Sequence, residues 1–174
     1  MFLFETDSFK NRLDYVTLSC GDATVINRIT EYPNLTRLYL SAELGKLQAS
    51  KESRSLAYIF TEIKDNSVYI VDFLSRYENL GNGKKLFFIL LDYIFQINKH
   101  YHIEKISGFI SKFDFDHWSK LFHFYGSLND YVKYVYPMLE LDFRLRKYEI
   151  ENLKKEIYLH TNEDIYFDIF ITYS

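Results

Sequence analysis

A chain of 174 residues is long enough for one domain with a substantial hydrophobic core. Its hydrophobic share of 48% and charged share of 26% are ordinary for a soluble globular protein, whereas the aromatic share of 19% is high. The net charge of −3 argues against a nucleic-acid-binding protein, which needs clustered Lys and Arg side chains. We therefore predict a single domain, residues 1–174, whose aromatic side chains mostly fill the core.

The sequence shows no signal for secretion or membrane insertion. The first residues lack the basic region and long apolar stretch of a signal peptide. The most apolar stretch, 86–95, is interrupted by Asp92 and is too short to span a bilayer. The single cysteine, Cys20, excludes an internal disulfide. We expect a cytoplasmic protein that does not bind a membrane.

Residues 1–75 are mostly strand-like. Residues 2–4 could form a short strand, the segment 9–29 mixes helical spacing with β-branched residues, and Pro33-Asn34 marks a break. An antiparallel meander is then suggested by three adjacent strand-like segments, 35–44, 56–63 and 67–75. Asp65-Asn66 is a plausible tight turn between the last two of them.

A crossover follows the meander. The segment 84–99 is apolar apart from a narrow polar stripe, which predicts a largely buried helix, and 103–110 reads as the next strand. Strand, glycine loop, helix and strand predict a right-handed βαβ unit with two parallel strands. The fold class is therefore α/β (α+β), with a central, mostly antiparallel mixed sheet flanked by helices.

Beyond residue 110 the signals alternate again. Asp116 is a good N-cap for a helix running to about Ser127, and Gly126 or Asn129 would help to stop it. The remaining segments are predicted in the order strand, helix, strand, over 131–136, 141–159 and 165–173.

A glycine-containing loop opens the helix of the crossover and could hold a phosphate group. Gly81 and Gly83 allow the backbone to turn sharply and to approach a ligand without side-chain collision. The amides of Leu80 to Lys84 would point outward at the N-terminus of this helix, where the helix dipole favours an anion such as a pyrophosphate. The alternative is that the glycines only form a tight strand-to-helix turn.

Two common phosphate-binding motifs fail here. The dinucleotide fingerprint lacks its third glycine, where Leu86 stands, and a Walker A loop would need Gly at Glu78 and Ser or Thr at Lys85. The segment 75–86 instead resembles the acetyl-CoA signature of the GNAT N-acetyltransferase superfamily, (R/Q)-x-x-G-x-(G/A). The segment 121–125 is similar to the A-x-x-F-Y segment of the same family.

The resemblance implies a GNAT-like fold and a transfer of the acetyl group of acetyl-CoA to a primary amine of a small molecule or a protein, without a metal. It also implies that the cofactor lies between the strands 67–75 and 103–110. The residues that would contact the cofactor belong to the first strand and the loop: Phe73, Leu74, Ser75, Glu78, Asn79, Leu80, Gly81, Asn82, Gly83 and Lys84.

Some positions depart from the family pattern. Glu78 stands where the family has Arg or Gln, and it would place a carboxylate near the pyrophosphate. Trp118 stands at the position of the usual Asn, and Leu121 at that of a small residue. These departures leave open a second hypothesis, a catalytically silent GNAT-like module that binds CoA or a protein partner.

Acetyl transfer needs a neutral amine, a donor for the developing oxyanion and a proton for the departing thiolate. The resemblance implies Tyr125 as the proton donor, and the alternative is a core tyrosine. Asp72 or Glu62, or a water between them, could accept the ammonium proton, although both could instead be solvated strand residues. Asp72 and Phe73 should lie on opposite faces of the sheet, because side chains alternate along a strand.

Other patterns are explained more simply without a metal site. His100 and His102 lack further ligands at a zinc spacing, and the segment 114–117 lacks the glycine and distal Glu of a calcium loop. A third hypothesis, from a different class, is an assembly protein that uses the predicted helix 141–159 and exposed aromatic residues as an interface. A homodimer is compatible with each hypothesis.

Overall fold

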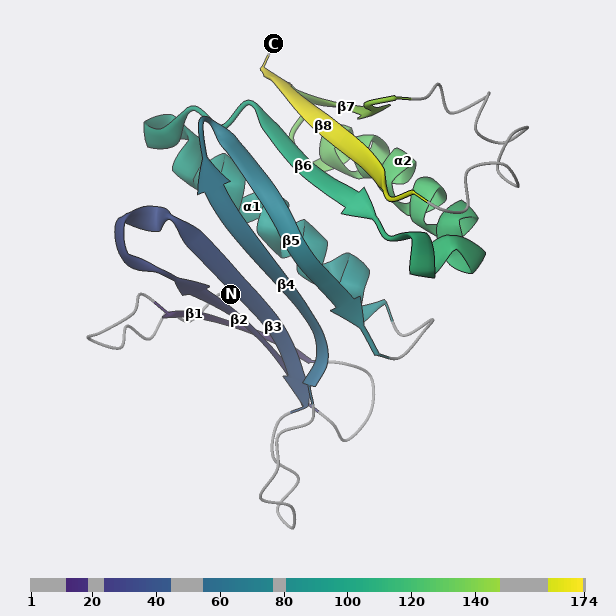
Figure 1. Ribbon diagram of the computed structural model, residues 1–174. Helices are drawn as coiled ribbons and strands as arrows, with labels where there is room; N and C mark the ends of the chain where they lie inside the picture. Colours follow the sequence, from purple (N-terminus) through teal and green to yellow (C-terminus); the bar gives the residue numbers. More distant parts are fainter. Residues whose placement is uncertain (1–11, 19–23, 45–54, 77–80, 148–162, 174) are drawn as a thin grey trace. The chain divides into compact units, whose positions relative to one another are not determined.

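The computed structural model describes residues 12–18, 24–44, 55–76, 81–147 and 163–173 (Figure 1). In chain order the strands are β1 (Arg12–Leu18), β2 (Thr24–Glu31), β3 (Arg37–Leu44), β4 (Ser55–Lys64), β5 (Ser67–Ser75), β6 (Lys105–Ile110), β7 (Leu139–Leu145) and β8 (Ile165–Tyr173). The α-helices are α1 (Asn82–Tyr101) and α2 (Trp118–Val135), and the 3₁₀ helices are η1 (Pro33–Leu35) and η2 (Lys112–His117).

Strand pairing follows the order β1-β2-β3-β4-β5-β6-β8-β7. β5 and β6 are parallel, with Ser67 opposite Lys105 and Tyr69 opposite Ser107, and helix α1 connects them. Strands β1 to β3 each pair antiparallel with the next strand, as do β6 with β8 and β8 with β7. The predicted α/β class, with its mostly antiparallel mixed sheet and its crossover at the glycine loop, is confirmed.

The chain divides into two compact units. The first unit comprises Met1–Lys64 and Ile70–Tyr101, and the second comprises Asp65–Tyr69 and His102–Ser174. The prediction of one domain over 1–174 stays a prediction. Within the described ranges, no helix combines the length and the hydropathy of a membrane span.

In the first unit, α1 packs on β3 and β4. The apolar residues that are fully buried there alternate along the strands and recur at helical spacing on α1: Leu38, Leu40, Ala42, Ala57, Ile59, Leu86, Phe87, Leu90, Leu91 and Ile94. The side chains that alternate with them on β3 and β4, such as Tyr58, therefore face away from α1.

In the second unit, α2 packs on β7, and the core lies between α2 and the strands. Phe167 and Ile169 of β8 are fully buried, as are Leu128 and Val132 of α2. Gly108 of β6 lies so close to Phe167 that a Cβ atom at residue 108 would be 2.6 Å from the ring Cζ. This glycine is therefore required for packing, because the ring leaves no space for a side chain.

The turn between β4 and β5 is the predicted one. Asp65 and Asn66 have φ angles of 50° and 58°, which is the left-handed conformation that a tight hairpin turn requires at both central residues. Asp and Asn tolerate this conformation better than other residues that carry a Cβ atom. The break at Pro33-Asn34 is also confirmed, because η1 occupies it and Asn34 has a φ of 57°.

The predicted helix after β6 differs from α2 at both ends. Asp116 is not the N-cap, because η2 covers Lys112–His117 and α2 begins at Trp118. The helix continues past Gly126 to Val135, so the strand predicted over 131–136 is wrong. The apolar stripe explains the continuation, since it extends at helical spacing through four buried side chains, Phe122, Tyr125, Leu128 and Val132.

The helix predicted over 141–159 is wrong in its first part, which is strand β7. Leu141 and Leu145 of this strand are buried, whereas the charged residues between them face outward, and this period of two is that of a strand. Asn129 does not end α2 either, because the helix continues to Val135. Its Oδ1 instead accepts a hydrogen bond from the Leu141 N–H of β7 at 2.9 Å. Residues 148–159 lie outside the described residues, so the interface proposed for this helix loses part of its basis.

Near the N-terminus, the described part of the ambiguous segment 9–29 belongs to the antiparallel strands β1 and β2. The strand predicted over 2–4 lies outside the described residues.

Candidate functional site

The start of α1 lies at the glycine-containing loop of the sequence analysis. Gly81 has a φ of +70°, and its carbonyl accepts the first helical hydrogen bond, from the Lys85 N–H at 2.9 Å. The amides of Asn82, Gly83 and Lys84 precede that bond and therefore have no partner within the helix. They lie at the positive end of the helix dipole, where an anionic group is stabilised.

Glycine is favoured at the two positions of the loop for different structural reasons. A Cβ atom at Gly81 would meet nothing within 4 Å, so its positive φ alone favours glycine. A Cβ atom at Gly83 would lie 3.1 Å from Ser75 Cβ and 3.2 Å from Phe73 Cζ. Gly83 is thus explained by the packing of α1 against β5, and a substitution there would disturb the protein itself before it reached a ligand.

Two cationic residues flank this loop. Lys84 Nζ lies 5.6 Å from the centre of the ring of Phe88, one turn further along α1. Arg76 follows β5 directly and donates its main-chain N–H to the Leu56 carbonyl at 2.9 Å. The other predicted loop contacts, Glu78, Asn79 and Leu80, lie outside the described residues.

Asp72 lies on β5, and its carboxylate is exposed. The Tyr58 hydroxyl of β4 donates a hydrogen bond of 2.6 Å to Asp72 Oδ2. The ring of Tyr58 stacks on that of Tyr39 of β3, with centroids 6.1 Å apart and an interplanar angle of 27°. The hydrogen bond to Asp72 is the main reason why the pKa of the Tyr58 hydroxyl is raised, so this phenol keeps its proton at neutral pH.

Glu62, the alternative base, is held at a different point. Its carboxylate pairs with Arg37 of β3 at 3.2 Å, in the cross-strand position that the register gives. Tyr58, the partner of Asp72, lies about 13 Å from Glu62 along β4, because a strand rises roughly 3.3 Å per residue. The structure therefore gives the two candidate carboxylates separate partners.

The predicted alternation along β5 is confirmed. The Phe73 ring faces α1, with its centroid 6.1 Å from that of Phe87, whereas Asp72 bonds to Tyr58 on the face away from α1. Leu74 lies on the same side as Asp72 by alternation and is 39% exposed. Ser75 lies beside the start of α1.

Tyr125, the predicted acid, belongs to the second unit and is only 5% exposed. Its ring packs against those of Phe143 and Phe167, with centroids 5.7 Å and 4.5 Å away. Burial raises the pKa of the Tyr125 hydroxyl well above its usual value. The phenol is therefore protonated at neutral pH, and its surroundings are those of a core residue.

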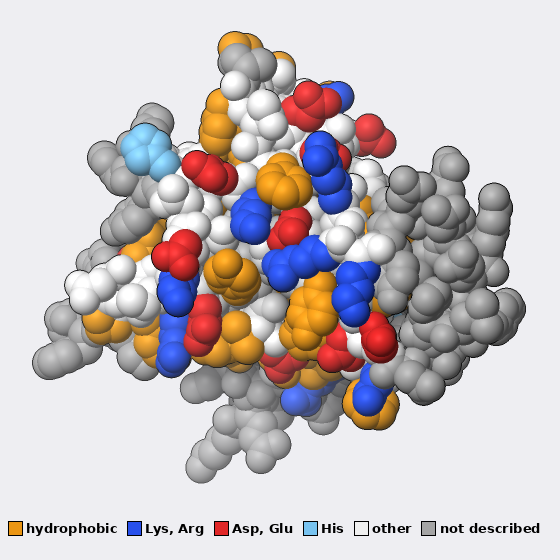
Figure 2. All heavy atoms as spheres, turned by 45° about the horizontal axis from the view of Figure 1, so that its top comes forward, with side chains coloured by type: hydrophobic (Ala, Val, Ile, Leu, Met, Phe, Trp, Pro, Cys, Tyr) orange, Lys and Arg blue, Asp and Glu red, His pale blue; other side chains and the backbone are white. Residues whose placement is uncertain are grey.

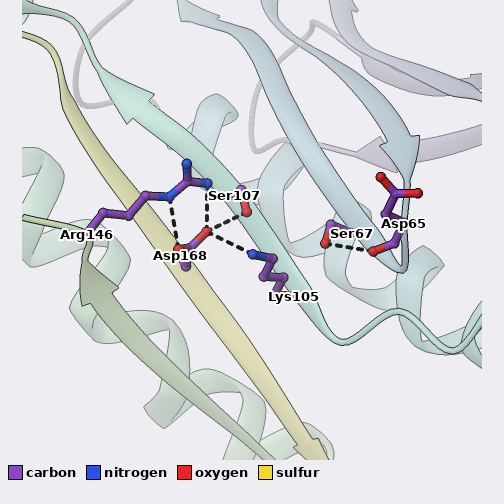
Figure 3. Close-up of polar contacts among 6 residues, drawn as sticks. All are labelled: Asp65, Ser67, Lys105, Ser107, Arg146 and Asp168. Atoms are coloured by element: carbon purple, nitrogen blue, oxygen red, sulfur yellow. Dashed lines mark hydrogen bonds and ion pairs between the residues drawn. The ribbon is translucent and has the colours of Figure 1, made fainter.

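A polar cluster in the second unit was missed by sequence reasoning (Figure 3). Asp168 of β8 is 9% exposed and accepts two hydrogen bonds from the Arg146 guanidinium, both at 3.0 Å, and one from Ser107 Oγ at 2.6 Å. Lys105 Nζ lies 3.7 Å from the same carboxylate. Burial alone would raise the pKa of Asp168, but the hydrogen bonds from Arg146 and Ser107 and the two positive charges lower it.

The cluster ties the strands of this unit together. Ser107 is directly opposite Asp168 on β6, and the Arg146 N–H donates to the Tyr166 carbonyl just beyond the end of β7. The sequence indicates this cluster only weakly. Asp168 is the one acidic residue of β8, and by alternation it lies on the same face as Tyr166 and Phe170. The surface view shows Lys and Arg side chains interspersed with Asp and Glu (Figure 2).

Among the described residues, no group of three or more His, Cys, Asp and Glu side chains is arranged to hold a metal ion. Asp114 lies in η2 and is exposed, and His102 has a φ of 48° just after α1.

No protein-family model matches the chain. No curated protein matches it. Among solved structures, it is similar to a candidate streptothricin acetyltransferase from Bacillus anthracis str. Ames in complex with acetyl coenzyme A. That match has a TM-score of 0.42 and 14% identity, over 98% of this chain and 90% of that chain. Because this similarity is low, the function proposed for the chain rests on its own sequence and on the geometry of the described residues.

Proposed function

We propose that the protein is a divergent GNAT-type enzyme that transfers the acetyl group of acetyl-CoA to a primary amine of a small molecule or a protein. The observation that carries this proposal is the start of α1. The helix begins at Asn82, between Gly81 and Gly83, as the helix of a parallel β5-α1-β6 crossover, and its first amides have no partner within the helix. A signature-like segment thus coincides with a geometry that suits a pyrophosphate.

In this proposal the pyrophosphate accepts hydrogen bonds from the amides of Asn82, Gly83 and Lys84. The main chain of Phe73, Leu74 and Ser75 would contact the pantetheine arm, as the family resemblance implies. Tyr125 would protonate the departing thiolate, and a carboxylate of β4 or β5 would take the ammonium proton. The phenol of Tyr125 is protonated at neutral pH, and its raised pKa makes it a weaker acid than an exposed tyrosine.

The main-chain cradle is tested by substitutions at Asn82, the first residue of α1. Proline is tolerated at the first helical position but removes the amide donor, whereas alanine retains it. We expect Asn82→Pro to weaken acetyl-CoA binding about 10- to 100-fold, the value of one charge-assisted hydrogen bond. Asn82→Ala should change it less than about threefold.

Isothermal titration calorimetry measures both affinities, and thermal unfolding confirms that the variants are folded. Acetyl-pantetheine, which lacks the pyrophosphate, provides a second comparison and should bind far more weakly than acetyl-CoA. Equal binding of the two thioesters, or equal binding by the two Asn82 variants, would contradict the proposed cradle.

A second candidate is a catalytically silent module that binds CoA. The packing of Tyr125 between Phe143 and Phe167 favours it, because a phenol enclosed by core residues has less access to a thiolate. An assay of thiol release from acetyl-CoA over a panel of amines separates the two candidates. Tight binding of acetyl-CoA without release of thiol on any amine would favour the silent module.

A further inference from the structure

We propose that Asp72, and not Glu62, binds the ammonium group of the acceptor amine and takes its proton, and that Tyr58 is a positioning residue that orients the Asp72 carboxylate. This inference rests on the proposed function, because it names the residues that meet the second substrate. It follows from a comparison of the carboxylates on the face of β3, β4 and β5 that points away from α1.

The carboxylates of this face differ in their partners. Glu43 pairs with Arg28 at 2.7 Å, and Glu62 pairs with Arg37 at 3.2 Å, so each has a guanidinium that neutralises its charge. Asp72 accepts a hydrogen bond only from the neutral hydroxyl of Tyr58, and no cation of the described residues lies within ion-pair distance of it. Of these three carboxylates, Asp72 is therefore the one whose negative charge has no ion-pair partner among the described residues and is available to an ammonium group.

The position of the Asp72 carboxylate is set by its neighbours. Tyr58 bonds to Oδ2 at 2.6 Å, which leaves Oδ1 available to accept a hydrogen bond from an ammonium group. Tyr39 stacks on the Tyr58 ring and restricts its rotation. The two tyrosines are partly exposed, and their rings also favour a cation nearby, because the face of an aromatic ring is negative.

A charged neighbour competes for this site. Arg76 is exposed and close enough to Tyr39 and Tyr58 to lower the pKa of both hydroxyls, although other groups raise these pKa values overall. It does not form an ion pair with Asp72. The cationic acceptor therefore has to bind beside Arg76, and Asp72 supplies the compensating charge.

Asp72 accepts one proton from the bound ammonium group and passes it to solvent. The neutral amine nitrogen then forms a bond to the thioester carbonyl carbon, and the carbon–sulfur bond breaks. The departing thiolate takes a proton from the donor of the proposed function, and the excess proton on nitrogen replaces the proton of that donor, so the products are an acetamide, the thiol of CoA and one proton released to solvent.

The test uses the full chain, acetyl-CoA and cadaverine as the probe amine, with Asp72→Asn and the matched control Glu62→Gln. Each substitution removes one negative charge and keeps the size of the side chain. We expect Asp72→Asn to lower kcat/KM for cadaverine about 100-fold or more, as for the loss of a general base, and Glu62→Gln to lower it less than about threefold. Both variants should bind acetyl-CoA as the unmodified protein does.

A calorimetric titration of cadaverine, without turnover, gives a second readout. The unmodified protein and Glu62→Gln should bind the amine, and Asp72→Asn should bind it at least about 10-fold more weakly. An amine that binds equally to all three proteins, or to none, would overturn the inference whatever the thiol assay shows. Failure of acetyl-CoA to bind the unmodified protein would instead overturn the proposed function, so the two failures are distinguishable.

The role of Tyr58 is tested by Tyr58→Phe, alone and combined with Asp72→Asn. A positioning residue acts through Asp72, so the single variant should lose about 10-fold in kcat/KM and the double variant should equal Asp72→Asn. Acetyl-CoA affinity should not change. Independent losses that add in the double variant would show that Tyr58 does not act through the carboxylate.

Discussion

Asp72 of the first unit and Asp168 of the second both lie on β-strands, but their surroundings are opposite. Asp168 is 9% exposed and is bonded by Arg146 and Ser107, with Lys105 close by. Asp72 is exposed, and its hydrogen-bond partner within the described part of the chain is the neutral hydroxyl of Tyr58. A carboxylate that protein cations saturate holds strands together, whereas a carboxylate fixed by a neutral donor retains a charge that a ligand can use.

The largest effect expected from this contrast is on stability. We expect Asp168→Asn to lower the free energy of unfolding by about 2–3 kcal/mol, because charge-assisted hydrogen bonds at a nearly buried site are lost. Asp72→Asn should lower it by less than about 0.5 kcal/mol, as for an exposed side chain. Urea unfolding at neutral pH measures both values. Equal losses of unfolding free energy in the two variants would contradict the proposed difference between Asp168 and Asp72.

The next effect concerns activity in the second unit. If Tyr125 donates a proton to the thiolate, Tyr125→Phe should lower kcat about 10- to 100-fold while acetyl-CoA affinity stays the same. Single-turnover thiol release measures this step. A change in thermal stability without a change in kcat would assign Tyr125 to the core and would confine the chemistry to other residues.

The smallest effect is a dependence on pH. The pKa of Asp168 is lower in the folded protein than in the unfolded chain, so its contribution to stability is complete above the unfolded pKa of about 4. That contribution is lost as the pH falls through the lower folded pKa. The gap in unfolding free energy between the unmodified protein and Asp168→Asn should therefore narrow between about pH 5 and pH 2. A constant gap over this range would mean that the hydrogen bonds do not depend on the charge.

Local chemistry made much of the sheet predictable. The strands over 67–75 and 165–173 were predicted with the bounds that β5 and β8 have, because β-branched and aromatic residues alternate there. The Asp65-Asn66 turn was recognisable from its residues, and the crossover followed from the order of elements. Interactions along a few neighbouring residues determine each of these features.

The predictions that proved wrong concern segments whose secondary structure is determined by tertiary packing and not by the local sequence. Gly126 is exposed, and a Cβ atom added there would meet nothing within 4 Å. The glycine therefore weakens α2 only through its low helix propensity, and burial of the apolar stripe continues the helix past it. In β7 the charged residues suggested a helix, but burial of alternate residues on α2 makes it a strand. The partner of Asp72 was not predictable for a related reason, since a shift of one residue between β4 and β5 would turn Tyr58 away.

The hydrogen bond from the Leu141 N–H to Asn129 Oδ1 has a consequence for the behaviour of the molecule in concentrated solution. β7 is the last strand in the pairing order of the described residues, and an outermost strand offers main-chain groups that can recruit a strand from another molecule. Asn129 occupies one of these donors from within the same chain. A side chain on a helix thereby makes the rim of the sheet a poorer template for aggregation.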